Sequence, residues 1–267
     1  MSDSQANVGA MIREWRTRRR MSQLDLAGEA AISQRHLSFV ERGRAAPSRD
    51  MVIRLAEGLD VPLRQRNRML LAAGFAPHYG ERALADSAMG PAMETVRAVL
   101  KGHEPCPAIA VDRHWTMIAA NGALAPFLAG IGEPSLLRPP VNVLRLSLHP
   151  RGLAPRIVNL AEWKAHLLER LKRQNAAFGD PALEALETEL RAYPGGVSPT
   201  RIVHNAGTAI AHMLRLRAGD AVLSFISTIT VFGTPLDVTL SELAIESFFP
   251  ADESTRMALQ KLTAGNA

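Results

Sequence analysis

Apolar residues recur at intervals of three and four through the first part of the chain, which is the spacing of amphipathic helices. The first run of this kind covers one helical face: Val8, Met11, Ile12 and Trp15. Four further helices begin at residues that commonly start helices: Ser22, Ser33, Ser48 and Pro62. The last of these helices ends at Gly74. The pattern therefore predicts an all-α domain of five short helices over residues 1–74.

The regular spacing stops after this domain. Residues 75–90 contain a proline, two glycines and little periodicity, so we expect a linker there. Two short apolar segments, residues 106–111 and 115–121, then flank a turn and predict a β-hairpin. The hairpin ends at Asn121, directly before a predicted short helix at residues 123–128. We expect Asn121 to cap that helix.

Helical patterns fill the middle of the remaining chain, and strand patterns return near its end. A long helix is predicted at residues 160–178, and Asp180-Pro181 begins another. Three segments with alternating or β-branched residues follow: residues 212–217, 221–232 and 242–247. Strands on both sides of a helical region predict an α+β domain with an antiparallel sheet over residues 91–267.

The charge is distributed unevenly between the two predicted domains. Residues 1–82 carry 14 arginines, no lysine and nine acidic residues, whereas the rest of the chain carries 17 residues of each sign. The whole net charge of +5 therefore lies in the first third. A compact basic domain joined to a neutral one predicts a polyanionic partner for the basic domain.

The arrangement of the second and third helices indicates which polyanion is bound. They are separated by Ala30-Ala31-Ile32, and the small alanines allow a close approach at the turn. Two short helices joined in this way form a helix-turn-helix, in which the second helix enters the major groove of DNA and the first braces it. We therefore expect double-stranded DNA as the partner.

Residues 12–62 also resemble the helix-turn-helix of the phage-repressor type, the XRE family. The resemblance rests on the spacing from Arg16 to Ser22-Gln23, on Ile32-Ser33 before the third helix, and on Glu41-Arg42-Gly43 at its end. Pro47-Ser48 before the fourth helix matches as well. The resemblance implies a DNA-binding domain of five helices, with an internal ion pair between the residues at positions 16 and 41.

The same resemblance implies which side chains contact DNA. Gln34 and Arg35 open the recognition helix, where an amide pairs with adenine and a guanidinium with guanine. One turn later, Ser38 and Phe39 are candidates for a base edge and a thymine methyl group. The candidates for phosphate contacts are Gln23, Arg42 and Arg44.

The second domain is similar to the ligand-binding domain of the MmyB-like transcription regulators. The resemblance rests on PAIAVDRHWTMIAAN at residues 107–121 and on the segment that contains LSFISTITVF at residues 223–232. It implies a PAS-like fold with an apolar cavity for a non-covalent, fatty-acid-like ligand. The candidate lining residues are Trp115, Phe127, Trp163, Phe225, Ile226 and Phe232.

Several kinds of chemistry lack their usual residues in this sequence. There is no phosphate-binding G-x-x-x-x-G-K-[ST] loop, no G-x-G-x-x-G and no G-x-S-x-G, and the histidines and the single Cys106 lack zinc spacing. We therefore expect no catalytic residues, no metal and no cofactor. A single cysteine, the lack of a signal-peptide core and the lack of a long apolar run indicate a cytoplasmic protein without a membrane partner.

Together these observations predict a homodimeric, sequence-specific transcription regulator whose second domain binds a small apolar effector. Two alternatives remain open at this point. In the first, the protein binds DNA constitutively and its second domain serves only dimerisation. In the second, the chain is an enzyme with a DNA-binding appendage, which would require a convergent set of ionisable residues in the second domain.

Overall fold

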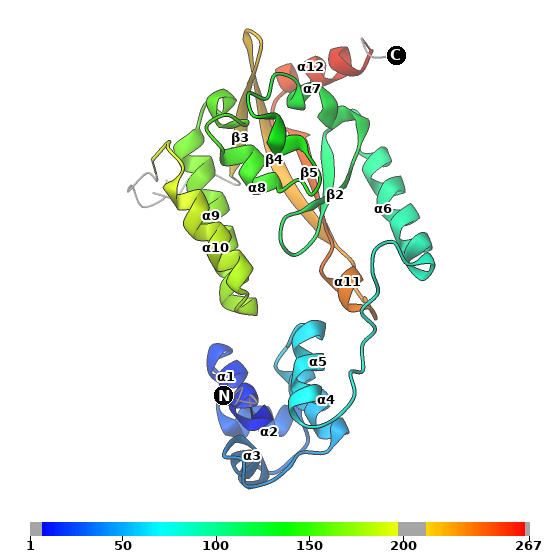
Figure 1. Cartoon of the computed structure of the whole chain (residues 1–267), viewed down its shortest axis with the longest axis vertical. Coiled ribbons are helices and arrows are strands. Elements are labelled where there is room, and N and C mark those ends of the chain that lie inside the picture. The colour runs from blue at the N-terminus through cyan, green and yellow to red at the C-terminus, as the bar shows by residue number, and fades with distance from the viewer. Residues whose placement is uncertain (1–6, 197–211, 265–267) are drawn as a thin grey trace. The chain divides into compact units, whose positions relative to one another are not determined.

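The helical and the strand-rich parts of the chain fold into two separate compact units. The computed structural model describes residues 7–196 and 212–264 (Figure 1). The smaller unit consists of Met1–Arg82 and Thr234–Ser241, and the larger unit consists of Ala83–Gly233 and Glu242–Ala267. The segment expected to be a linker, residues 75–90, therefore contributes residues 75–82 to the smaller unit and 83–90 to the larger one.

Five short helices form the main part of the smaller unit, as the apolar spacing predicts. They are α1 (Val8–Arg18), α2 (Gln23–Glu29), α3 (Gln34–Glu41), α4 (Arg49–Gly58) and α5 (Leu63–Ala72). The three predicted serine caps are confirmed, because Ser22, Ser33 and Ser48 each accept a hydrogen bond from the backbone N–H three residues later. Their apolar faces meet in one core that includes Ile12, Leu26, Leu37, Leu55 and Leu70.

The chain beyond α5 is held against this bundle. Asn67 on α5 bonds both to the backbone N–H groups of His78 and Tyr79, through Oδ1, and to the Tyr79 carbonyl, through Nδ2, at distances of 2.8–3.0 Å. Because Asn67 is buried, these bonds satisfy polar groups that water does not reach. Residues 75–82 are thus part of a fixed structure rather than a free connector.

A five-stranded antiparallel sheet lies at the centre of the larger unit. Its strands are β1 (Ala108–Val111), β2 (Met117–Ala120), β3 (Met213–Ala218), β4 (Ala221–Val231) and β5 (Ala244–Pro250). They are arranged in the order β2-β1-β5-β4-β3, and every neighbouring pair is antiparallel. The predicted antiparallel sheet is confirmed.

Helices cover both faces of this sheet (Figure 1). The α-helices are α6 (Gly90–Gly102), α7 (Ala125–Leu128), α8 (Val143–Leu148), α9 (Leu160–Phe178), α10 (Pro181–Ala192) and α12 (Glu253–Ala264), while α11 (Val238–Ser241) belongs to the smaller unit. One face packs Phe225 and Ile109 against α9, and the other packs Ala108 and Ile245 against α6. Neighbouring strand residues point to opposite faces, so β1 and β5 contribute to both cores.

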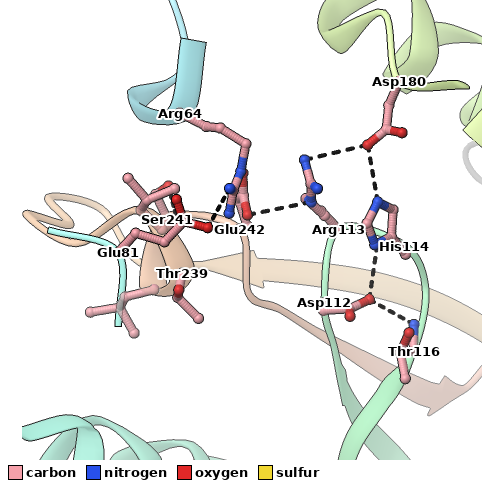
Figure 2. A network of polar contacts seen from close by, with 12 residues as sticks. Arg64, Glu81, Asp112, Arg113, His114, Thr116, Asp180, Thr239, Ser241 and Glu242 are labelled. Atoms are coloured by element: carbon pink, nitrogen blue, oxygen red, sulfur yellow. Dashed lines mark hydrogen bonds and ion pairs between the residues drawn. The ribbon is translucent and has the colours of Figure 1, made fainter. Parts of the chain in front are cut away.

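The tip of the β1–β2 hairpin is attached to α9 and α10. Figure 2 shows Arg113 and His114 both directed at Asp180, the N-cap residue of α10, at 3.3 Å and 3.0 Å. Trp115 adopts a left-handed backbone conformation with a φ of 65°, and its indole N–H donates to Gln174 on α9 at 2.8 Å. A buried indole whose N–H has a partner stabilises this otherwise strained position.

The expected role of Asn121 is wrong. Its side chain does not cap the following helix. Instead, its Oδ1 accepts from the Ala108 N–H, and its Nδ2 donates to the carbonyls of Leu100 and Cys106. Asn121 therefore joins the end of β2 to β1 and to the C-terminus of α6. These bonds satisfy both the buried side-chain amide and the backbone groups around it.

Two general features of the described residues bear on function. Within residues 7–196 and 212–264, no helix is both long enough and apolar enough to cross a membrane. Among these same residues, no group of three or more His, Cys, Asp or Glu side chains is arranged as metal ligands would be.

Candidate nucleic-acid interface and ligand cavity

Glu41, the last residue of α3, lies at the point where three helices of the smaller unit meet. Its carboxylate accepts two hydrogen bonds from Arg16 on α1, at 2.6 Å and 3.0 Å, and one from the Gln23 amide on α2, at 2.7 Å. Burial alone would raise the pKa of Glu41, but the hydrogen bonds from Arg16 and Gln23 outweigh it and hold that pKa below its usual value. The predicted ion pair between Arg16 and Glu41 is confirmed.

A close backbone contact sets the distance between α1 and α3. A Cβ atom added to Gly9 would lie 2.1 Å from the carbonyl oxygen of Val40. This distance is too short for any residue with a side chain. Gly9 therefore allows the two helices to touch. The role of Gly9 cannot be predicted from the sequence, because a glycine inside a helix has no signal for a contact 31 positions away.

The exposed face of α3 carries the side chains expected to read DNA. Gln34 and Arg35 are exposed in the first turn of the helix, where the Ser33 cap already satisfies the N–H of His36. Leu37 and Val40 on the opposite face are buried in the core. The helix thus presents its N-terminal end and two long polar side chains to the solvent.

The other two candidates on α3 are placed differently from each other. Phe39 is half-buried, and the Arg35 guanidinium lies 5.5 Å from the centre of its ring. Ser38 is 7% exposed, and its hydroxyl accepts a hydrogen bond from Arg42. In this arrangement Ser38 orients the Arg42 guanidinium and does not present its own hydroxyl to the solvent.

The remaining candidates lie at the two ends of the helix pair. Gln23 begins α2, and its amide is bonded to Glu41 as described above. Arg44 is exposed in the loop after α3, where Gly43 has the positive φ of 69° that ends the helix. At the arginine-rich end of α1, Arg19 joins α1 to the end of α4, because its guanidinium donates to the carbonyls of Leu59 and Asp60.

In the larger unit, the six aromatic and aliphatic candidates do not surround one cavity. Trp115, Phe127, Trp163 and Phe225 belong to the core on the α9 face of the sheet. Phe232 packs against the α6 core, and Ile226 follows Phe225 in β4, so its side chain points to that same opposite face. The sheet therefore separates these residues into two groups.

A cavity of about 210 Å³ does occur in the larger unit, and Phe127 is the one candidate that lines it. Its other walls come from the α6–β1 connection, from the segment before α7, from α7 itself and from α12: Glu104, Pro105, Gly122, Ala123, Pro126, Leu259 and Leu262. The wall is mostly apolar, and its one carboxylate, Glu104, accepts a hydrogen bond from the Gly122 N–H at 3.0 Å. Helix α12, which contributes Leu259 and Leu262, is not among the elements predicted from the sequence.

The single cysteine lies close to this region. Cys106 is half-buried, and burial raises the pKa of its thiol. A raised pKa lowers the fraction of thiolate at neutral pH, and the thiolate is the reactive form. Cys106 packs at the edge of the core on the α9 face of the sheet.

Comparisons with known protein families match both units of the chain. A model described as the MmyB-like transcription regulator ligand binding domain matches residues 92–262, which is more than half of the chain. A model described as helix-turn-helix matches residues 12–65, which include α2, α3 and α4.

Individual relatives match over a shorter region. Proteins named uncharacterized HTH-type transcriptional regulators, from Mycobacterium bovis and from two strains of Mycobacterium tuberculosis, are each 37% identical to this chain over 70 residues. The match covers 26% of this chain and 27% of each relative. This likeness therefore spans about a quarter of the curated relatives.

The hydrogen bonds of Glu41 predict that the stability of α3 depends on this residue. Replacing Glu41 with Ala leaves Arg16 and Gln23 without their shared acceptor, which we expect to destabilise the smaller unit by about 3 kcal/mol. Hydrogen exchange in the full-length chain should then show the α3 amides opening about 100-fold more often.

The matched control is Glu14→Ala, which removes an exposed carboxylate that pairs with Arg18 on the same helix, α1. We expect this change to cost less than about 0.5 kcal/mol, because an exposed pair contributes little. Equal exchange rates in the two variants would contradict the role assigned to Glu41.

Proposed function

Since the chain belongs to the family of MmyB-like transcription regulators, we propose that it is a sequence-specific DNA-binding regulator whose larger unit binds a small apolar effector. The observation that carries the DNA-binding part is the exposed face of α3. Gln34 and Arg35 stand at the solvent-facing N-terminal end of a helix whose other face is fixed by Glu41. A helix held in this way fits the major groove as a rigid body.

Each candidate side chain has a proposed role in this interface. Gln34 and Arg35 contact base edges, and Phe39 contacts a thymine methyl group while its ring supports Arg35. Arg42, positioned by Ser38, and Arg44 contact phosphates. The side-chain amide of Gln23 is already bonded to Glu41. Gln23 therefore contributes to phosphate binding through its backbone N–H at the start of α2.

We further propose that two copies of the chain bind one operator. A dimer places two recognition helices in successive major grooves, about 34 Å apart, on a quasi-palindromic site. The net positive charge of residues 1–82 attracts the duplex and supports a salt-dependent contribution to its affinity.

The effector part of the proposal rests on the cavity beside Phe127. Its volume of about 210 Å³ is below the ~300 Å³ or more of common small-molecule sites, so it accommodates the apolar part of a ligand rather than the whole of a long one. Its lining contains a carboxylate and no basic side chain. We therefore propose that an acyl chain enters the cavity while its carboxylate stays outside.

The DNA-binding proposal predicts different effects for base-reading and phosphate-binding residues. After selection of a preferred duplex from random sequences, Gln34→Ala or Arg35→Ala should weaken its binding by about 1–3 kcal/mol and leave binding to random duplex nearly unchanged. Arg44→Ala should weaken both equally and reduce the dependence of affinity on salt concentration.

Arg68→Ala is the matched control, since Arg68 is an exposed arginine on α5, outside the helix-turn-helix pair. We expect it to change affinity much less than Arg44→Ala does. If all four variants lose affinity equally for selected and random duplexes, the assignment of roles on α3 is wrong.

The effector proposal is tested by native mass spectrometry of the purified full-length chain with a saturated long-chain fatty acid. We expect one bound molecule per chain, and about tenfold weaker binding in Ala123→Leu, which fills the cavity. Ala88→Leu, at an exposed position away from the cavity, serves as the control. A dimer that binds DNA but no such ligand would instead support a larger unit that serves only dimerisation.

A further inference from the structure

The connection between β4 and β5 belongs to the smaller unit, although both strands belong to the larger one. β4 ends at Val231 and β5 begins at Ala244, and residues Thr234–Ser241 between them group with Met1–Arg82. The chain therefore passes between the two units three times, after Arg82, after Gly233 and after Ser241. We refer to residues 234–241 as the coupling segment.

Several specific bonds hold the coupling segment to residues 80–82. The N–H of Val238 donates to the carbonyl of Gly80 at 2.8 Å, and the Thr239 hydroxyl donates to the carbonyl of Arg82 at 2.6 Å. The Arg82 guanidinium lies 3.1 Å from the Asp237 carboxylate, and Gly80 and Asp237 form an isolated parallel β-bridge.

The coupling segment is packed as well as bonded. Val238 is fully buried and Asp237 is 6% exposed, whereas Leu236 beside them is 83% exposed. The other oxygen of the Asp237 carboxylate accepts from the N–H groups of Thr239 and Leu240 and so starts α11. A buried carboxylate with several donors resists displacement, because each lost bond would leave a buried polar group unsatisfied.

These contacts continue into the helix bundle. Residues 78 and 79 are fixed by the three hydrogen bonds of Asn67, and Glu81 pairs with Arg64, which is also on α5. α5 packs in the same core as α1 and α4, through Met69 and Leu70. A displacement of the coupling segment therefore acts on the bundle through α5.

At both of its ends the coupling segment continues into the strands of the larger unit, β4 before it and β5 after it. Phe225 on β4 contacts Phe127 edge-on, with 5.8 Å between the ring centres, and Phe127 lines the cavity. β4 ends at Val231, six positions after Phe225. A ligand that moves Phe127 would thus act on the strand that leads into the coupling segment.

We propose that residues 234–241 transmit effector binding from the larger unit to the DNA-binding unit. A single flexible tether would hold the two units near each other without passing a displacement between them, whereas a segment fixed in its middle and continuous with strands at both ends can pass one on. This inference rests on the proposed function, since it describes how the two proposed binding events influence each other. By thermodynamic reciprocity, DNA binding must also affect the larger unit.

Reciprocity allows a test that needs no identified ligand, with a selected duplex as the probe. Hydrogen exchange of the full-length chain is measured with and without this duplex. In the unaltered protein, we expect the duplex to slow exchange of the β4 and β5 amides by about fivefold or more. In Thr239→Val, which keeps the shape and removes the bond to Arg82, and in Asp237→Asn, we expect this slowing to disappear while exchange in α3 still slows.

Asp220→Ala is the matched control, because this exposed aspartate lies in the turn at the opposite end of β4. It should leave the response of the strands unchanged. If the strands do not respond in the unaltered protein, or if they respond equally in Thr239→Val and Asp237→Asn, the coupling role is wrong even though DNA binding itself stands. Failure of the unaltered protein to bind any duplex would contradict the proposed function, and the coupling role with it.

Discussion

The position of the recognition helix depends on one buried carboxylate. Glu41 brings together α1, α2 and α3 through Arg16 and Gln23, and Gly9 allows α1 to approach within contact distance of the α3 backbone. A buried charge is tolerated only when it is fully paired, so these partners are required together. The same bonds that stabilise the helix bundle therefore also orient the side chains that face the solvent on α3.

The sheet of the larger unit lies between two hydrophobic cores, one on each of its faces. Strand alternation directs Phe225 into the core beneath α9 and its neighbour Ile226 to the opposite face. β4 and β5 then lead into residues 234–241, which pack with the smaller unit. In the proposed coupling, a change near Phe127 therefore passes along β4 to residues 234–241.

The elements with strong local signals could be predicted from the sequence, and the contacts between distant residues could not. The serine caps and apolar spacing predict α2–α4, and the long apolar stripe with a proline start predicts α9 and α10. The position of Asn121 before a helix predicts a local capping role, but its amide bonds groups on β1 and α6 that its neighbours in the sequence do not reveal. The same holds for Lys164, which is 1% exposed and donates to the carbonyls at the end of α10, and for Asp237 with Arg82, which are 155 residues apart.

In the proposed mechanism, an apolar ligand in the larger unit changes the affinity of the smaller unit for DNA. The most direct measurement titrates a selected duplex with the full-length protein from which bound lipid has been extracted, before and after a saturated long-chain fatty acid is added back. We expect the two dissociation constants to differ by about fivefold or more, and the difference to be lost when Ala123 is replaced by Leu to fill the cavity. Equal dissociation constants with and without a demonstrably bound fatty acid would show that ligand binding does not regulate DNA binding.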